Sequence, residues 1–295
     1  SATAPPPAAT PTRTPTAAAP AVPPPATPAR RPSATRSVAR PPAARRRPAA
    51  PGSPLHASGA WRRAFADHAG GIGCEQGYAQ LAASGTARLT VGRTTLFVGF
   101  QQYGRNQDPV VARFDGTTKV YCEHHEKQSP DGRALGLTWD GGATAYVVYT
   151  VVGGGTDLET AARGGWVDHY GDGGGSSSVT VLGRVDVRTG TLTRATFVPA
   201  HRGQDGRDRT NSLVPAAAPL VTASGGVALP ARSAYSPLNP DRSRMCHGAS
   251  EYPSPGPGRI DEASWVGVFA ADLASLTCAT TWGCGAVRRP CPAVG

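Results

Sequence analysis

The stretch TTLFVGFQQYGRNQDPVVARFDGTTKVYC, residues 94–122, decides the fold class. It contains two apolar, β-favouring runs, 96–100 and 110–114, and the second run is followed by an Asp-Gly pair at 115–116. Asp-Gly between such runs is a strong hairpin signal, because glycine adopts positive φ at little cost. Residues 117–122 then alternate, as a half-buried strand does. We expect three antiparallel strands joined by tight turns.

The same pattern of four short strands occurs three times from residue 86 onward. The predicted strands are 87–91, 95–100, 109–115 and 118–122 in the first unit; 134–140, 144–152, 179–186 and 191–198 in the second; and 213–223, 227–234, 265–272 and 275–282 in the third. In each unit the third strand ends in Asp before a turn, where its carboxylate can accept hydrogen bonds from turn amides. Repeated four-stranded units are typical of propeller blades or similar sheet arrays.

Two long insertions separate the second and third strands of the later units. One covers 153–178, and its Thr156-Asp157-Leu158-Glu159 capping-box pattern predicts a short helix. The other covers 235–263 and is rich in Pro, Ser and Gly. We expect both insertions to project at the rims, with the first strand of each unit innermost and most buried.

Residues 1–55 have the composition of a disordered or extended stalk or linker, followed by a folded domain over 56–295. The stalk contains 16 Pro and eight Arg but no Asp or Glu, a composition that cannot bury enough apolar surface to fold. It therefore carries most of the formal charge of +10, and the rest of the chain has 22 basic against 20 acidic residues. A nucleic-acid surface needs clustered basic charge on the folded part, so we expect no nucleic-acid partner.

The cysteines and the chain's beginning indicate an extracytoplasmic protein. The sequence does not start with Met, which suggests a removed leader, and no apolar run reaches the ~18–20 residues of a membrane span. There is no CxxC pair, so disulfides are favoured over zinc. The six candidates are Cys74, Cys122, Cys246, Cys278, Cys284 and Cys291. They allow 15 pairings. A local Cys284–Cys291 loop is plausible, and Cys122 and Cys278 should each find a partner outside their own strands.

Over about residues 60–283 the repeats resemble those of secreted bacterial β-propellers of the seven-bladed repeat type. The resemblance rests on Leu96-Phe97-Val98-Gly99 and Tyr146-Val147, on Val111-Ala112-Arg113-Phe114-Asp115 and Leu182-Gly183-Arg184-Val185-Asp186, and on Trp61 and Trp282. It implies an all-β, propeller-like array of about three four-stranded antiparallel blades, and a binding or scaffold role. With so few blades the ring would be irregular, open or completed by another chain. A β-sandwich is the alternative fold.

Candidate ligand-binding residues lie in the first insertion. Trp166 and Tyr170, next to glycines, could stack on a sugar, and Asp168 and His169 lie between them. The competing interpretation is that the aromatic rings pack the loop onto its own blade. An Asp-His pair also suggests a catalytic triad, but no GxSxG elbow accompanies it. We therefore assign no catalytic residue.

The sequence offers no cofactor or metal motif. Glu123-His124-His125-Glu126 invites a metal assignment, but adjacent strand residues point to opposite faces and HEXXH spacing is absent. A surface turn is the favoured interpretation. The predicted function is a non-enzymatic, secreted or cell-surface binding or structural module on a Pro-rich stalk. It would bind a cell-wall or extracellular polymer or self-associate in a surface layer or filament. The alternative is an extracellular hydrolase or lyase acting on polysaccharide.

Overall fold

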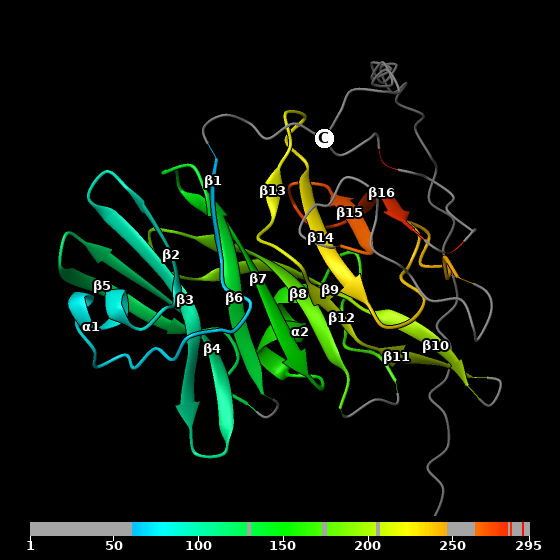
Figure 1. Cartoon of the computed structure of the whole chain (residues 1–295), viewed down its shortest axis with the longest axis horizontal. Coiled ribbons are helices and arrows are strands. Elements are labelled where there is room, and N and C mark those ends of the chain that lie inside the picture. Colours follow the sequence, from blue (N-terminus) through cyan, green and yellow to red (C-terminus); the bar gives the residue numbers. More distant parts are fainter. Residues whose placement is uncertain are drawn as a thin grey trace, which may run out of the picture. The chain divides into compact units, whose positions relative to one another are not determined.

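The computed structural model describes residues 61–128, 131–172, 176–204, 207–246 and 263–282, together with Cys284 and Cys291. These residues form an all-β fold with two short helices, drawn in Figure 1. The predicted stalk, residues 1–55, lies outside the described residues, as does most of the second insertion. No helix among the described residues has both the length and the apolar character required to cross a membrane.

The first predicted unit is an antiparallel four-stranded sheet. Its strands, in spatial and chain order, are β2 (Ala87–Val91), β3 (Thr94–Tyr103), β4 (Asn106–Asp115) and β5 (Thr118–His124). The turn between β4 and β5 places Gly116 at φ 62°, a conformation that suits glycine. The hairpins predicted from residues 94–122 are therefore confirmed.

The second and third units are also antiparallel meanders. The second consists of β6 (Gly132–Trp139), β7 (Thr144–Val152), β8 (Ser178–Asp186) and β9 (Leu192–Val198). The third consists of β12 (Leu213–Pro215), β13 (Leu220–Val221), β14 (Val227–Ser233), β15 (Trp265–Phe269) and β16 (Leu276–Thr281). A two-stranded hairpin, β10 (Ala200–Gln204) and β11 (Arg207–Asn211), connects them.

The second and third units do not form separate blades, because they share one ten-stranded sheet. Leu213 of β12 pairs in parallel with Val179 at the start of β8, just before the residues of β8 that pair with β9. The sheet then runs β1-β6-β7-β8-β12-β14-β15-β16, where β1 is Arg62–Phe65. Because β1 and β16 are the two ends of this path, the hydrogen bonds among the described strands do not close a ring.

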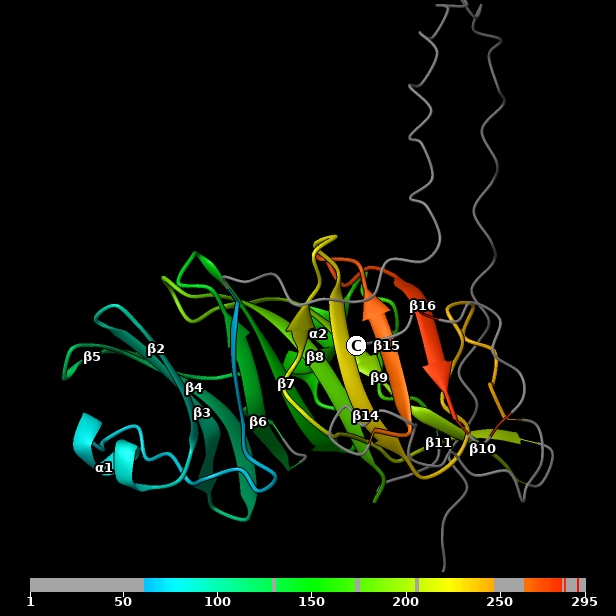
Figure 2. The same ribbon diagram turned by 45° about the horizontal axis from the view of Figure 1, so that its top comes forward.

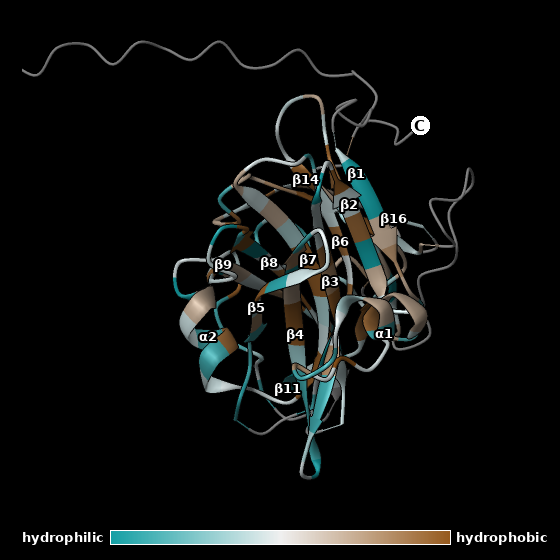
Figure 3. Cartoon of the chain, turned by 90° about the vertical axis from the view of Figure 1, so that its left-hand side faces the viewer, coloured by the Kyte–Doolittle hydropathy of each residue, from teal (hydrophilic) through white to brown (hydrophobic). Residues whose placement is uncertain are grey.

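The four-stranded sheet is buried on both faces. Leu96, Val98 and Val111 belong to the large core shared with the ten-stranded sheet. The opposite face, turned toward α1 (Tyr78–Ala83), forms a separate small cluster. Its members are Ile72, Leu81, Phe97, Val110, Ala112 and Phe114. Figure 2 shows α1 beside β3 and β4, and Figure 3 shows the strands between α1 and α2 (Thr156–Ala162).

Two expectations about burial hold only in part. The first strand of the second unit, β6, is buried at seven of its eight residues, as expected, but the first unit differs. In β2, the first strand of its unit, only Ala87 and Leu89 are buried, because β2 is an edge strand; β3 and β4 are far more buried. The 153–178 insertion does not project as a whole. Its predicted helix is α2, which packs on β9 through buried Leu158 and Ala162.

All six cysteines form disulfides, but the predicted pairing of Cys284 with Cys291 was wrong. The bonds are Cys74–Cys122, Cys246–Cys284 and Cys278–Cys291. As expected, Cys122 and Cys278 pair outside their own strands. Cys291 reaches Cys278 because both belong to an apolar cluster on β14–β16 that also contains Val268.

Candidate functional site

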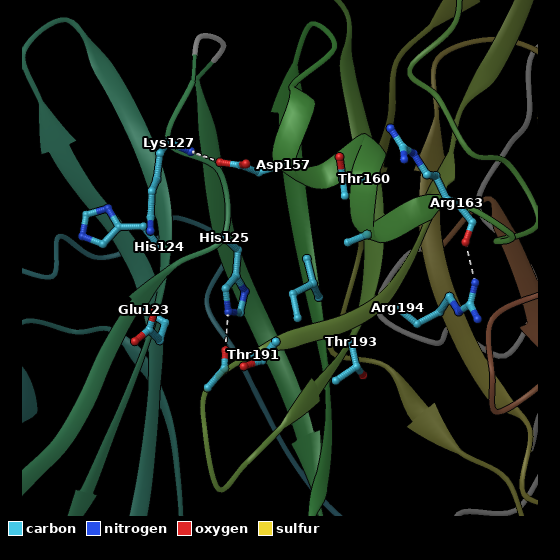
Figure 4. A pocket seen from close by; sticks show the side chains of 13 residues that line it. Glu123, His124, His125, Lys127, Asp157, Thr160, Arg163, Thr191, Thr193 and Arg194 are labelled. Carbon is cyan, nitrogen blue, oxygen red and sulfur yellow. Dashed lines mark hydrogen bonds between the residues drawn. The ribbon is translucent and has the colours of Figure 1, made fainter.

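A polar cavity lies where β5 ends, between α2 and the turn that joins β8 to β9. It has a volume of about 530 Å³. Figure 4 shows the side chains that line it, which come from these three segments of the chain. Among the described residues that line the cavity, none is Trp, Tyr or Phe. A ligand there would be held by charges and hydrogen bonds and not by ring stacking.

Two carboxylates hold α2 against the end of β5. Glu126 accepts hydrogen bonds from the backbone N–H of Leu158 (3.1 Å) and Gln128 (3.0 Å), while Asp157 accepts one from the N–H of Lys127 (3.0 Å). Glu126 is fully buried, and burial raises the pKa of its carboxyl group. Gly155 packs directly against it, and a Cβ at this position would displace the Glu126 carboxylate. The two walls of the cavity are therefore fixed relative to each other.

His125 forms part of the cavity wall but has no free ring nitrogen. Its Nε2 is 2.8 Å from the carbonyl oxygen of Gly190, which can only accept, so Nε2 carries the proton. Its Nδ1 then accepts the hydroxyl proton of Tyr149 at 2.7 Å. Burial lowers the pKa of His125 to about 4. This histidine is neutral at physiological pH and acts as a structural link between β5, β7 and the β8–β9 turn.

The exposed lining of the cavity combines cations, hydroxyl groups and two carboxylates. Lys127 and Arg163 are exposed, and no described residue pairs with either charged group. Arg194 donates to the backbone carbonyl of Arg163, which fixes its guanidinium at the edge (Figure 4). The carboxylates are Glu123 and Asp157. The hydroxyl groups come from Thr160, Thr191 and Thr193.

The four residues predicted to bind a ligand are divided between core and surface. Trp166 is 3 % exposed and donates from Nε1 to the carbonyl of Pro240; Tyr170 is 4 % exposed and donates to the carbonyl of Ser177. Both rings therefore pack the insertion onto the sheet and are not available for stacking. Asp168 and His169 are exposed and bonded to each other at 2.7 Å.

A second, smaller cavity lies near the predicted residues. Its volume is about 190 Å³, and His169 and Tyr170 contribute to its wall together with His201 and Asp208. His201 Nδ1 lies 3.0 Å from Asp208 Oδ2. The 530 Å³ cavity contains none of the four predicted residues, so the two sites are distinct.

The sequence interpretation missed most of the larger cavity. Glu123-His124-His125-Glu126 was assigned to a surface turn, but His125 and Glu126 are buried because α2 and the β8–β9 turn cover them. Arg163 and Arg194 had no motif to mark them, since they come from segments far apart in the chain. The four consecutive polar residues were the one usable signal.

The described residues contain no group of three or more His, Cys, Asp or Glu side chains arranged to hold a metal ion. The chain matches no known family model, and no characterised protein or solved structure is significantly similar to it. The site is therefore interpreted from its own chemistry.

Proposed function

We propose that this chain is an extracytoplasmic binding domain that holds an anionic, hydroxyl-rich segment of a cell-wall or extracellular polymer in the 530 Å³ cavity. The observation that carries the proposal is the pair of exposed, unpaired cations, Lys127 and Arg163, beside a wall of threonine hydroxyls. Charged donors of this kind bind carboxylates and phosphates, and hydroxyl groups match those of a sugar. Three disulfides support the assignment to an oxidising compartment.

We further propose kinship with the propeller repeats that the sequence resembles, and a stalk function for residues 1–55. The first two units, each a four-stranded antiparallel meander, support the kinship. In this proposal the stalk holds the domain at a distance from its anchor, and the cavity engages the polymer. The domain carries out no chemical step on it.

The binding test uses polygalacturonate as an acidic polymer and dextran as a neutral one, with affinity measured by calorimetry. We expect polygalacturonate to bind and dextran not to bind. Replacing Lys127 and Arg163 by Gln should weaken binding by about tenfold or more, because a hydrogen bond to a charged group contributes about 1.5–3 kcal/mol. Arg105→Gln is the matched control, since Arg105 is exposed on the β3–β4 turn, away from the cavity. Equal binding of both polymers would contradict the proposal.

Hydrolase or lyase activity on the same polymer is the second candidate, because Glu123 and Asp157 line one cavity. Glycoside hydrolases use two carboxyl groups that flank the bond to be cleaved. In this structure Asp157 is occupied by the N–H of Lys127, and both nitrogens of His125 are engaged. Release of reducing ends from polygalacturonate, abolished in Glu123→Gln, would establish the enzyme and overturn the binding-only function.

A further inference from the structure

The Cys74–Cys122 disulfide lies beside a histidine that is paired with a buried carboxylate. His124 Nε2 is 3.5 Å from Cys74 Sγ, and His124 Nδ1 is 3.0 Å from Asp108 Oδ2. The Asp108 side chain is 5 % exposed and the His124 side chain 19 %. The imidazole ring of His124 thus links the sulfur of Cys74 to the carboxylate of Asp108 through its two nitrogens.

The strand register explains why these groups meet. His124 on β5 is opposite Val110 on β4, and Cys122 is opposite Ala112. Alternate residues share a face of a strand, so Asp108 lies on the same face as Val110, and Cys122 on the same face as His124. Cys74 approaches from the loop before α1, on the side of the sheet where the small apolar cluster lies. The arrangement is produced by three separate segments.

This order of groups is the one that activates a thiol nucleophile. When the Asp108 carboxylate accepts the Nδ1 proton, Nε2 of neutral His124 is free to take the proton of a reduced Cys74 thiol. The products are a thiolate and an imidazolium held together by charge. A nucleophile, a base and a group that orients the base are the required elements, and thiols paired with His⁺ ionise far more readily than free cysteine.

We propose that Cys74–Cys122 is a redox-active disulfide that accepts two electrons from a dithiol in an extracytoplasmic protein or peptide. This activity goes beyond polymer binding and does not depend on it. The first substrate thiol gives up its proton to neutral His124 and attacks Cys122 Sγ as a thiolate. The Sγ–Sγ bond breaks, and Cys74 leaves as a thiolate stabilised by the His124 imidazolium so formed. The second substrate thiolate then attacks the substrate sulfur of the mixed disulfide. Cys122 leaves as a thiolate and takes a proton from water, so the substrate becomes a disulfide and the protein a dithiol.

The other two disulfides lack this environment. Among the described residues, no histidine nitrogen is hydrogen-bonded to the sulfur of Cys246, Cys278, Cys284 or Cys291. In each of the two, one cysteine is buried, Cys246 at 2 % and Cys291 at 9 % exposed, and its partner, Cys284 or Cys278, is half-buried as Cys74 and Cys122 are. Exchange needs access as well as activation, so these two disulfides serve as internal controls.

Other charged groups near Cys74 would affect the ionisation of its thiol, some favouring the thiolate and others opposing it. Lys119 donates from Nζ to the Cys74 carbonyl oxygen, which brings a positive charge that favours the thiolate. Glu75 is adjacent in sequence and exposed, and Asp108 lies behind His124; both are acidic. His124 is the group in contact with the sulfur, so its removal should change the pH dependence of thiol reactivity the most.

The first test treats the full chain with reduced glutathione at pH 7, quenches by alkylation and maps the opened disulfides by mass spectrometry. We expect Cys74–Cys122 to open about tenfold faster than either Cys246–Cys284 or Cys278–Cys291. Opening at an equal or slower rate overturns the proposal without any variant.

The second test measures alkylation of Cys74 between pH 5 and 9 after selective reduction of this disulfide. In the wild type, the midpoint of the pH profile should lie well below the value of about 8.5 that a free cysteine thiol shows. His124→Gln should shift it upward and reduce the rate at pH 6 about tenfold, and Asp108→Asn should shift it in the same direction. His201→Gln, which removes a histidine with the same 3.0 Å carboxylate contact, should leave the profile unchanged. An unchanged profile in His124→Gln overturns the proposal; if that variant does not fold, a wild-type profile centred near 8.5 does so.

Discussion

The two faces of the four-stranded sheet are built differently. The face turned toward the ten-stranded sheet contributes Leu96, Val98 and Val111 to a core formed by long apolar strands. The face turned toward α1 has a small cluster closed by Cys74–Cys122, with Asp108 and His124 at its edge. No cysteine belongs to the described residues of the large core, whereas the small one combines a covalent bond with buried polar groups. Both candidate sites lie at the end of β5: Glu123 and His125 line the cavity, and His124 contacts the disulfide.

The largest expected effect comes from emptying the small cluster. Phe97 is fully buried and meets Phe114 and Tyr78 edge-to-face at 5.6 Å between ring centroids. Phe97→Ala should lower the free energy of unfolding by about 3–5 kcal/mol. Tyr103→Ala, at a position 71 % exposed, should change it by less than about 0.5 kcal/mol. Both are measured by urea denaturation.

The same experiment tests whether the two faces unfold together. Because β3 and β4 contribute to both cores, we expect Phe97→Ala to shift a single transition seen alike by fluorescence and circular dichroism. Two separate transitions would show that the small cluster is an independent unit and would contradict this view of the sheet.

Removal of the Cys74–Cys122 cross-link should have the next largest effect. The bond joins residues 48 positions apart, and the Cys278–Cys291 bond joins residues 13 apart. The chain-entropy model gives about 4 kcal/mol for the longer loop and about 3 kcal/mol for the shorter. Calorimetry on Cys74→Ser/Cys122→Ser and Cys278→Ser/Cys291→Ser proteins should reproduce this order, and a reversed order would mean that native contacts outweigh loop length.

Acid should destabilise the protein through His125, the neighbour of His124 on β5. The unfolded chain binds a proton at this histidine near pH 6.5, whereas burial holds the folded-state pKa at about 4. The contribution of neutral His125 to the free energy of unfolding is thus fully present above pH 6.5. It is lost as the pH falls toward 4, by roughly 3 kcal/mol. Glu126 acts in the opposite sense, because its pKa is raised. Urea denaturation at pH 7, 5.5 and 4 should show a smaller acid loss for His125→Gln than for the wild type.

The smallest effect is expected at the exposed pair of the first insertion. The hydrogen bond from His169 lowers the pKa of Asp168, but both side chains are more than half exposed. Solvent screens such a pair, so Asp168→Asn should change the unfolding free energy by less than about 0.5 kcal/mol. A loss above 1 kcal/mol in urea denaturation would show that the exposed pair stabilises the insertion as strongly as a buried contact.

The sequence alone determined the local elements. The Asp-Gly turn, the alternating runs and the Thr156–Glu159 pattern predicted the meanders and α2, because periodicity and turn chemistry act over a few neighbouring residues. The capping box itself does not form, since α2 begins after Gly155 with no side-chain capping hydrogen bond. The turn aspartates show this locality. Asp186 accepts from the N–H groups of Arg188 and Thr189, and Asp272 from that of Ala274, whereas Asp115 is used by Thr94 and Arg113 instead.

Only the tertiary structure decided how the meanders combine and where the site forms. The parallel pairing of β12 with β8, which merges two predicted blades, depends on how far β9 extends along β8. The burial of His125 and Glu126 depends on α2 and the β8–β9 turn closing over them. The cysteine pairs and the cavity likewise join residues distant in sequence. Such contacts are selected by packing and charge in three dimensions, for which neighbouring residues carry no signal.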